Sequence, residues 1–282
     1  MTLTRCSMLE WGFAETVESL NQGFTGYQVP LSFTLSSLLQ AVRVDGIDAT
    51  ASQIVRRAGQ AVGVALIARR GWRCRLAAMA IAPAARGQGV GRWLMREVLS
   101  DARKRGERGM VLEVIETNTP AVKLYQSGGF QTVRRLVSYE RPAAAEQDLS
   151  PEATRRAALQ EVDIHTVAQL VTAHGLPDLP WQLSGPTVTQ LGPPYRAYQL
   201  EDAYALISDP AAAKIGIRAL LVLPESRGQG QGVRLLQALA ATFPEKALQV
   251  PALFPEEMGS TFVKAGFTRD ALAQLQMATQ IA

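Results

Sequence analysis

Runs of apolar and β-branched residues predict an antiparallel meander in the first half of the chain. The runs are Ser52–Arg57, Ala61–Arg69 and Arg73–Ala82. The short turn sequences Ala58–Gln60 and Arg70–Trp72 separate them, as in hairpins. Strands joined in this way are neighbours in one sheet, so we expect this region to form a sheet.

After the third run the apolar spacing changes to that of a helix, which we expect to begin at Val90. The apolar residues that recur at helical spacing are Leu94, Met95, Val98, Leu99 and Ala102. Further along, the pattern predicts a strand at Met110–Ile115, a helix at Pro120–Ser127 and a last strand after Gly128–Phe130. The first half therefore alternates between sheet and helix.

The second half repeats this order of elements. Its expected strands are Tyr195–Leu200, Ala203–Ser208, Ile215–Leu223, Ala247–Val250 and Ala271–Met277, with a helix that ends near Ala265. Between the halves, the stretch Arg141–Ala158 is rich in Ala, Pro and charge, which is typical of a linker. We therefore expect two α/β domains, residues 1–141 and 159–282, joined by a linker at 142–158. Each domain is predicted to be a mixed, mostly antiparallel sheet flanked by helices.

Composition narrows the class of protein. Hydrophobic residues make up 47% of the 282 residues and charged residues 19%, which is typical of a soluble globular protein. We expect no membrane span and no signal peptide, and so a cytoplasmic protein. The net charge of +4 comes from 29 basic and 25 acidic residues spread along the chain. This balance favours an anionic small ligand over a nucleic-acid partner.

Cysteine and histidine offer little chemistry. Cys6 and Cys74 are too few and too far apart in sequence for a disulfide scaffold or a metal site, so we expect reduced thiols and no metal. The two histidines, His165 and His174, lie in a stretch with the pattern of an ordinary helix. Acid/base chemistry is therefore expected from other residue types.

A glycine-rich turn stands between the third predicted strand and the helix that follows it. It consists of Arg86, Gly87, Gln88, Gly89, Val90 and Gly91. Successive backbone N–H groups at a helix N-terminus can hold a pyrophosphate, although glycines also serve simply as turn formers. The spelling fits neither a P-loop nor the dinucleotide fingerprint. The turn recurs 141 positions later as Arg227, Gly228, Gln229, Gly230, Gln231 and Gly232, which indicates a second cofactor loop.

Two motifs resemble the GNAT superfamily of acetyl-CoA-dependent N-acetyltransferases. The first is R/Q-x-x-G-x-G/A after a strand with a hydrophobic-x-Pro end, here Ile81-Ala82-Pro83 and then Arg86–Gly91. The second is N-x-x-A-x-x-L-Y-x-x-x-G-F, matched by Asn118, Ala121, Leu124, Tyr125, Gly129 and Phe130. The resemblance covers residues 1–140, including an acceptor-side loop at Phe24–Pro30, and is thinner over 155–282. It implies two tandem GNAT-like domains.

The resemblance also implies a set of roles in the first domain. The glycine-rich turn would hold the pyrophosphate of acetyl-CoA, and the strand around Ile81 and Ala82 would pair with pantetheine and offer an N–H to the oxyanion. Tyr125 would be the general acid, with an aromatic core residue as the alternative. Asn118 would either contact the pantetheine arm or cap the next helix.

The general base and the nucleophile are argued from the residues around these motifs. Glu113 could deprotonate the amine through water, with a solvated or ion-paired carboxylate as the alternative, and Glu116 lies off that face. Neither motif contains a cysteine, so direct attack by the amine is preferred to an acyl-enzyme.

The second copy departs from the pattern. Phe262 stands where Tyr125 stands in the first copy, so we expect a degenerate domain that completes the acceptor pocket or packs against another chain, which leaves a homodimer open. Trp181 either lines that pocket or belongs to the core. The expected function is transfer of an acetyl group from acetyl-CoA to a primary amine of a small molecule or peptide. The alternative is a non-catalytic acyl-CoA sensor.

Overall fold

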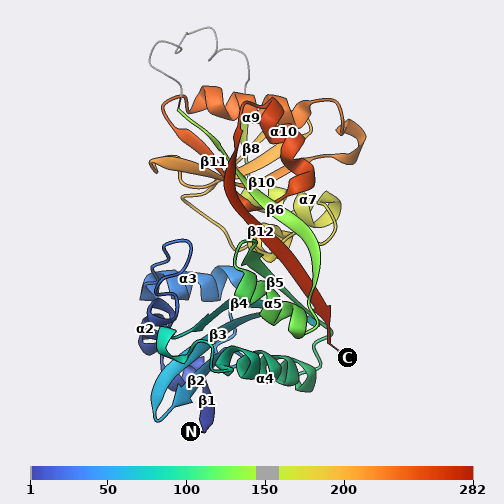
Figure 1. Cartoon of the computed structure of the whole chain (residues 1–282). Coiled ribbons are helices and arrows are strands. Elements are labelled where there is room, and N and C mark those ends of the chain that lie inside the picture. Colours follow the sequence, from blue (N-terminus) through green and yellow to red (C-terminus); the bar gives the residue numbers. More distant parts are fainter. Residues whose placement is uncertain (1, 144–158, 282) are drawn as a thin grey trace. The chain divides into compact units, whose positions relative to one another are not determined.

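The computed structural model describes residues 2–143 and 159–281 (Figure 1). Of the expected linker at 142–158, all but the first two residues lie outside the described part. The chain forms two compact units, one made of Met1–Val133 with Leu275–Ala282 and the other of Arg134–Gln274. Among the described residues, no helix combines the length and the apolar character needed to cross a membrane.

The first unit has a mixed sheet. Its strands, in sheet order, are β1 (Leu3–Ser7), β2 (Gln53–Arg57), β3 (Gln60–Arg70), β4 (Arg73–Ile81), β5 (Gly109–Ile115) and the end of β12 (Thr268–Gln280). The pairs from β1 to β4 are antiparallel and β4 pairs with β5 in parallel. The expected meander is confirmed to within one or two residues at each strand end.

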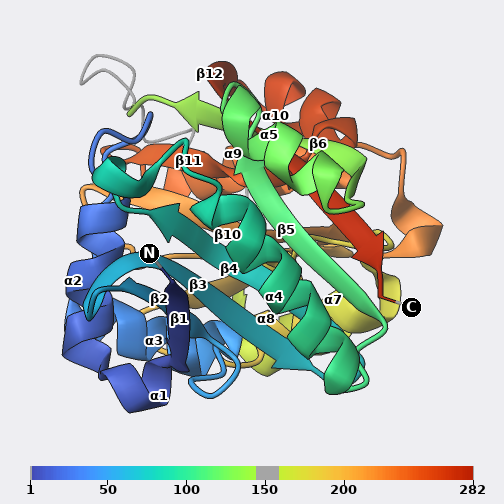
Figure 2. The same cartoon turned by 60° about the horizontal axis from the view of Figure 1, so that its bottom comes forward.

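Helices cover both faces of this sheet. They are α1 (Met8–Trp11), α2 (Phe13–Gly23), α3 (Leu35–Asp45), the short 3₁₀ turn η1 (Pro83–Ala85), α4 (Val90–Lys104) and α5 (Thr119–Ser127). Figure 2 shows α4 in front of β4 and β5. Ala65 and Ile67 of β3 belong to the core under α4, whereas the alternate residues Val64 and Leu66 are buried on the other face, where α2 packs. The first unit is therefore a sandwich with its sheet in the middle.

The C-terminal segment of the chain completes the core of the first unit. Met277 is 0% exposed and Ile281 is 8% exposed, and both pack in the same cluster as α4. The backbone N–H of Ile281 also donates to the carbonyl of Arg108 at 2.9 Å. The units therefore do not follow the linear division at residues 141 and 159, because the last strand of the chain belongs in part to the first unit.

The second unit has the same kind of architecture. Its strand order begins with the first part of β12 and continues with β6 (Gln131–Arg141) from Arg134 on, β11 (Ala247–Pro255), β10 (Lys214–Val222), β9 (Ala203–Ile207), β8 (Arg196–Leu200) and β7 (Gln160–Val162). Val137 and Tyr139 of β6 lie in its core. The first unit thus includes the end of β12, which comes from the C-terminal half of the sequence. The second unit includes β6 from Arg134 on, which comes from the N-terminal half.

The helices of the second unit follow the repeat. They are α7 (Ile164–His174), α8 (Gly185–Val188), α9 (Gln231–Thr242) and α10 (Gly259–Lys264), with 3₁₀ turns η3 (Trp181–Leu183), η4 (Pro224–Ser226) and η5 (Glu256–Met258). Helix α9 buries Leu235, Leu236 and Leu239 against the sheet, as its apolar spacing requires. Trp181, which the sequence left open, is buried.

Candidate active site

Strands β4 and β5 pair over a short stretch and then diverge. Their parallel ladder runs from Arg73 opposite Gly109 to Arg75 opposite Val111, whereas β4 continues to Ile81. The part of β4 beyond the ladder presents one backbone edge toward β5, and an extended amide chain can bind such an edge as an added strand. This opening lies where the sequence places the pantetheine arm.

A β-bulge on β4 lies at the start of this opening. Leu66 of β3 pairs with Ala78 and Ile67 pairs with Leu76, so Ala77 is the extra residue. A bulge turns the backbone locally and re-aims its polar groups. The oxyanion donor expected from this strand would come from this turned backbone.

The glycine-rich turn leads from β4 into α4. Gly87 and Gly89 have φ of 72° and 80°, a left-handed backbone that glycine adopts without strain, and Gly89 is the N-cap of α4. A Cβ added at either position would meet no atom within 4 Å, so the space in front of the turn is open. The open turn at the N-terminus of a 15-residue helix fits a phosphate group.

Arg86 holds the surrounding segments together. Its Nε donates to the carbonyl of Ile81 at 3.0 Å, and its Nη2 donates to the carbonyls of Gly23 and Thr25, each at 2.9 Å. The guanidinium thus joins the end of β4 to the end of α2. The predicted contact of this side chain with the cofactor stays a prediction, because these bonds already occupy two of its nitrogens.

The segment after α2, expected on the acceptor side, is also tied to the turn before α5. Gln28 Nε2 donates to the carbonyl of Thr117 at 3.1 Å, and the Thr117 hydroxyl donates to Gln28 Oε1 at 2.9 Å. Tyr27 is held between these ties and Arg86, and its hydroxyl acts electrostatically on Tyr125. From the sequence, Tyr27 was expected only as part of the acceptor-side loop Phe24–Pro30, without a role of its own.

Tyr125 lies on α5 and is only 8% exposed. Its ring packs on Phe130, with ring centroids 6.0 Å apart. Burial first, and the nearby Tyr27 second, raise the pKa of the Tyr125 hydroxyl above its usual range. The hydroxyl therefore keeps its proton at neutral pH, and the ring belongs to the core. The role of Tyr125 as general acid stays a prediction.

Glu113 of β5 forms a buried ion pair with Arg75 of β4. Arg75 Nε donates to Glu113 Oε2 at 2.7 Å, and the two side chains are 7% and 3% exposed. Both residues lie on the sheet face opposite Met110 and Leu112, which pack under α4. Arg75 was missed from the sequence, although its alternation with the buried Cys74 and Leu76 marked it as facing the other side.

Asn118 caps α5. Its Oδ1 accepts from the backbone N–H of Ala121 at 3.3 Å, which is one of the two roles considered from the sequence. The cap fixes the start of the helix that carries Tyr125, while the predicted contact of Asn118 with the pantetheine arm stays a prediction.

The model of the acetyltransferase (GNAT) family matches residues 25–130, the segment that holds the glycine-rich turn, the Arg75–Glu113 ion pair and Tyr125. The chain contains a GNAT acetyltransferase domain. It is 39% identical over 74 residues to a streptothricin acetyltransferase of Streptomyces lavendulae, which is 26% of this chain and 39% of that protein. It is 37% identical over 59 residues to an uncharacterized N-acetyltransferase of Schizosaccharomyces pombe, which is 21% of this chain and 36% of that protein. The chain thus spans under two fifths of these curated relatives.

Solved structures extend the likeness of fold to both units. A GCN5-related N-acetyltransferase from Sphaerobacter thermophilus matches with a TM-score of 0.71 and 14% identity, over 99% of this chain and 96% of the other. A tandem GNAT protein from the clavulanic acid biosynthesis pathway matches with a TM-score of 0.65 and 15% identity, over 100% of this chain and 99% of the other. At these identities the likeness concerns the fold, and it confirms a tandem GNAT fold.

The second GNAT-like unit keeps the frame of the first but changes its chemistry. The N–H of Phe267 donates to the carbonyl of Phe262 at 3.0 Å, as that of Phe130 donates to Tyr125 at 3.1 Å, so Phe262 occupies the tyrosine position. By strand register, Gly216 and Pro251 occupy the positions of Arg75 and Glu113. The tyrosine and the ion pair are thus both replaced in the second unit.

Proposed function

We propose that the first GNAT unit transfers an acetyl group from acetyl-CoA to a primary amine of a small molecule or peptide. The observation that carries this is the divergence of β4 from β5 beside an open glycine-rich turn, with the protonated Tyr125 on the adjoining helix. The family match over residues 25–130 supports it. Acetyl-CoA supplies an activated thioester when it is bound.

The chain's own residues have distinct parts in this reaction. The N–H groups of Gly87–Gly91 receive the pyrophosphate, and the edge of β4 beyond its ladder with β5, up to Ile81 and Ala82, aligns the amide arm. A backbone N–H at the bulge of β4 donates to the oxyanion that forms when the amine nitrogen attacks the thioester carbon. Tyr125 gives its proton to the sulfur as the C–S bond breaks, and the amine loses a proton to water or to Glu113.

A panel of amines tests which acceptor the protein uses. A curated relative is named for streptothricin, so amines of that antibiotic class form one arm of an acceptor panel and peptide N-termini form the other. Purified protein, acetyl-CoA and each amine would be combined, and free thiol would be followed with Ellman's reagent. We expect amine-dependent thiol release with at least one arm.

The control is loss of the phosphate turn. Gly89→Glu places a carboxylate in the open space of the turn. Gln88→Glu puts a negative charge on the side chain that accepts from Arg57 beside the turn, without the left-handed backbone of position 89. Acetyl-CoA at a hundredfold excess over Kd should stabilise the natural protein against unfolding by about 2.7 kcal/mol. It should not stabilise either variant. Stabilisation by acetyl-CoA without thiol release from any amine would favour the alternative, an acyl-CoA sensor.

A further inference from the structure

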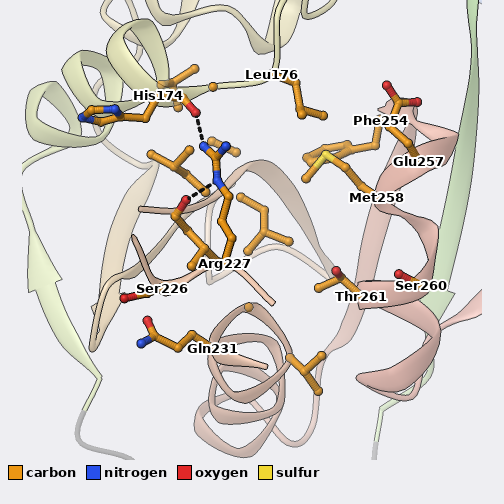
Figure 3. A pocket seen from close by; sticks show the side chains of 18 of the residues that line it. His174, Leu176, Ser226, Arg227, Gln231, Phe254, Glu257, Met258, Ser260 and Thr261 are labelled. Carbon is orange, nitrogen blue, oxygen red and sulfur yellow. Dashed lines mark hydrogen bonds between the residues drawn. The ribbon is translucent and has the colours of Figure 1, made fainter. Parts of the chain in front are cut away.

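The second unit contains a cavity of about 510 Å³ (Figure 3). One end is formed by apolar side chains from the segment after α7 and from β11 and η5, and Figure 3 shows Leu176, Phe254 and Met258 together there. Ser226 and Gln231, at the glycine-rich loop, lie on the opposite side. Figure 3 also shows Glu257 beside Phe254 and Met258, and this carboxylate pairs with Arg134 at 3.2 Å. The cavity is therefore mostly apolar at one end, with one paired carboxylate, and polar at the other.

This cavity occupies the position that the cofactor opening has in the first unit. Strands β10 and β11 pair only from Lys214 opposite Ala247 to Gly216 opposite Gln249 and then diverge, with a bulge at Arg218. Arg227 donates to the carbonyls of Val222 and His174, as Arg86 does to Ile81 and Gly23. The frame of the opening is thus repeated, which is why the sequence suggested a second cofactor loop.

The charges around the opening are not repeated. Arg57 is the last residue of β2, and its Nη1 donates to Gln88 Oε1 of the glycine-rich turn at 2.6 Å. In the second unit the turn between β8 and β9 is Glu201-Asp202, and Asp202 Oδ2 accepts from the hydroxyl of Ser226 at 2.6 Å. A carboxylate therefore lies beside the second loop. Arg234 Nη1 also donates to the Gln229 carbonyl of this loop at 2.9 Å, but its guanidinium is already paired with Glu201.

Two further basic residues are lost from the rim. Arg92 on α4 corresponds to Val233 on α9, and Lys123 on α5 corresponds to Ser260 on α10. CoA carries a pyrophosphate and a third phosphate, so its binding depends on such cations. With these replacements the second opening is poorly matched to a polyanion.

Two cations have been gained instead: Arg234, which stands at the position of Trp93 and is paired with Glu201, and Lys264. Lys264 lines the cavity, at the position that Ser127 has in the first unit. It lies one helical turn beyond Thr261, whose Cγ2 is 3.3 Å from the place of a Cβ on Gly232 at the start of α9. The polar end of the cavity thus combines the ammonium group of Lys264 with the N-terminus of α9, beside which the charge of Arg234 is balanced by Glu201. This arrangement suits one negative charge.

The cavity also lacks the acid that acyl transfer would use. Phe262 replaces Tyr125 and is buried between Tyr139, Phe254 and Phe267, with ring centroids 5.2 to 5.9 Å apart. We infer that the second unit binds an apolar molecule with a single negative charge, of the class of a medium-chain carboxylate, rather than CoA. The apolar body lies against Leu176, Phe254 and Met258, and the anionic group lies near Lys264 and Gly228–Gly232.

Displacement of a fluorescent monoanion tests this. 8-Anilinonaphthalene-1-sulfonate would be bound to the full-length Gly89→Glu protein, in which the phosphate turn of the first unit is blocked. We expect decanoate to displace the probe and acetyl-CoA not to displace it. Leu176→Trp fills the apolar end and should abolish displacement by decanoate, which ties the signal to this cavity.

The charge is tested by a matched pair of variants. Lys264→Glu should weaken decanoate binding by about tenfold, as expected for reversing one close charge, whereas Ser127→Glu at the equivalent position of the first unit should leave it unchanged. Displacement by acetyl-CoA would overturn the inference and restore a second cofactor loop. Equal decanoate affinity of Lys264→Glu and Ser127→Glu would overturn the inference as well. So would undiminished displacement of the probe by decanoate in Leu176→Trp. None of these measurements requires thiol release, so the proposed function stands or falls separately.

Discussion

Burial of the Tyr125 hydroxyl determines how it can act. Because burial raises its pKa, the proton stays on the oxygen to a higher pH than on an exposed tyrosine. Tyr125→Phe keeps the ring against Phe130 and removes the proton, so turnover should fall by roughly 100- to 10,000-fold with little change in Tm.

The raised pKa of Tyr125 predicts that the effect of Tyr125→Phe on turnover does not change with pH near neutrality. Between about pH 6 and 9 the Tyr125 hydroxyl does not titrate, since its pKa lies above its usual value of about 10. The ratio of natural to Tyr125→Phe turnover should therefore be constant over this range. A ratio that falls toward pH 9 would mean that the hydroxyl ionises there and is less buried in the working protein.

The Arg75–Glu113 ion pair makes the proposed base testable. Glu113→Gln leaves the buried Arg75 guanidinium without its charged partner, which typically costs about 3–5 kcal/mol of unfolding free energy. We expect a lower Tm, measured by calorimetry, and a lower turnover at pH 7. If Glu113 deprotonates the amine, turnover should recover as the pH rises and the free amine becomes neutral in solution. A loss of turnover that is equal at pH 7 and pH 9 would leave Glu113 as a structural partner of Arg75.

At the scale of elements, the end of β12 is the part of the first unit that lies farthest away in sequence. Met277→Ala removes a fully buried side chain from the core under α4 and should cost about 2–5 kcal/mol. Hydrogen exchange of β5, Gly109–Ile115, should accelerate although the substitution is far from it in sequence. Gln280→Ala, an exposed position of the same strand, is the control and should leave exchange unchanged. Unchanged exchange in both variants would show that β12 does not stabilise the first unit.

The strands themselves could be predicted, but their assignment to units could not. Alternation of apolar and polar residues in β12 requires a sheet with one buried face, and Met277 satisfies that requirement in either unit. Side-chain periodicity carries no information about which neighbouring strand supplies the hydrogen bonds. Linear boundaries at 141 and 159 therefore follow the linker composition and not the sheet.

Some parts of the candidate site could likewise be predicted from the sequence, and others could not. Motif spelling located the glycine-rich turn and the helix of Tyr125, because turn glycines and caps leave local signals. Motif spelling could not reveal that Arg86 donates hydrogen bonds to backbone carbonyls. It also could not reveal that Tyr27 raises the pKa of Tyr125. Those contacts join segments about 60 and about 100 residues apart, and only tertiary packing brings them together.

At the scale of the whole molecule, the two units share a frame and differ in reactive groups. Both have a bulged central strand, a short parallel ladder and an arginine that ties the loop to the preceding helix. These shared features are ones that hold backbone in place. The replaced ones, Tyr125 by Phe262 and Arg75 with Glu113 by Gly216 with Pro251, are those that carry protons and charge. This difference supports our proposals that the first unit transfers an acetyl group and that the second unit only binds a ligand.

The last prediction follows from this asymmetry and compares matched variants of the two loops. Gly89 and Gly230 have φ of 80° and 77° and both are N-caps, so substitution by Glu strains both backbones alike. Turnover should be lost in Gly89→Glu and largely kept in Gly230→Glu, with folding of each checked by circular dichroism. The physical reason is that Phe262 has no proton to give to a thiolate, whatever the second loop binds. Equal losses in two folded variants would contradict a single transferring unit, and a selective loss in Gly230→Glu would move the reaction to the second unit.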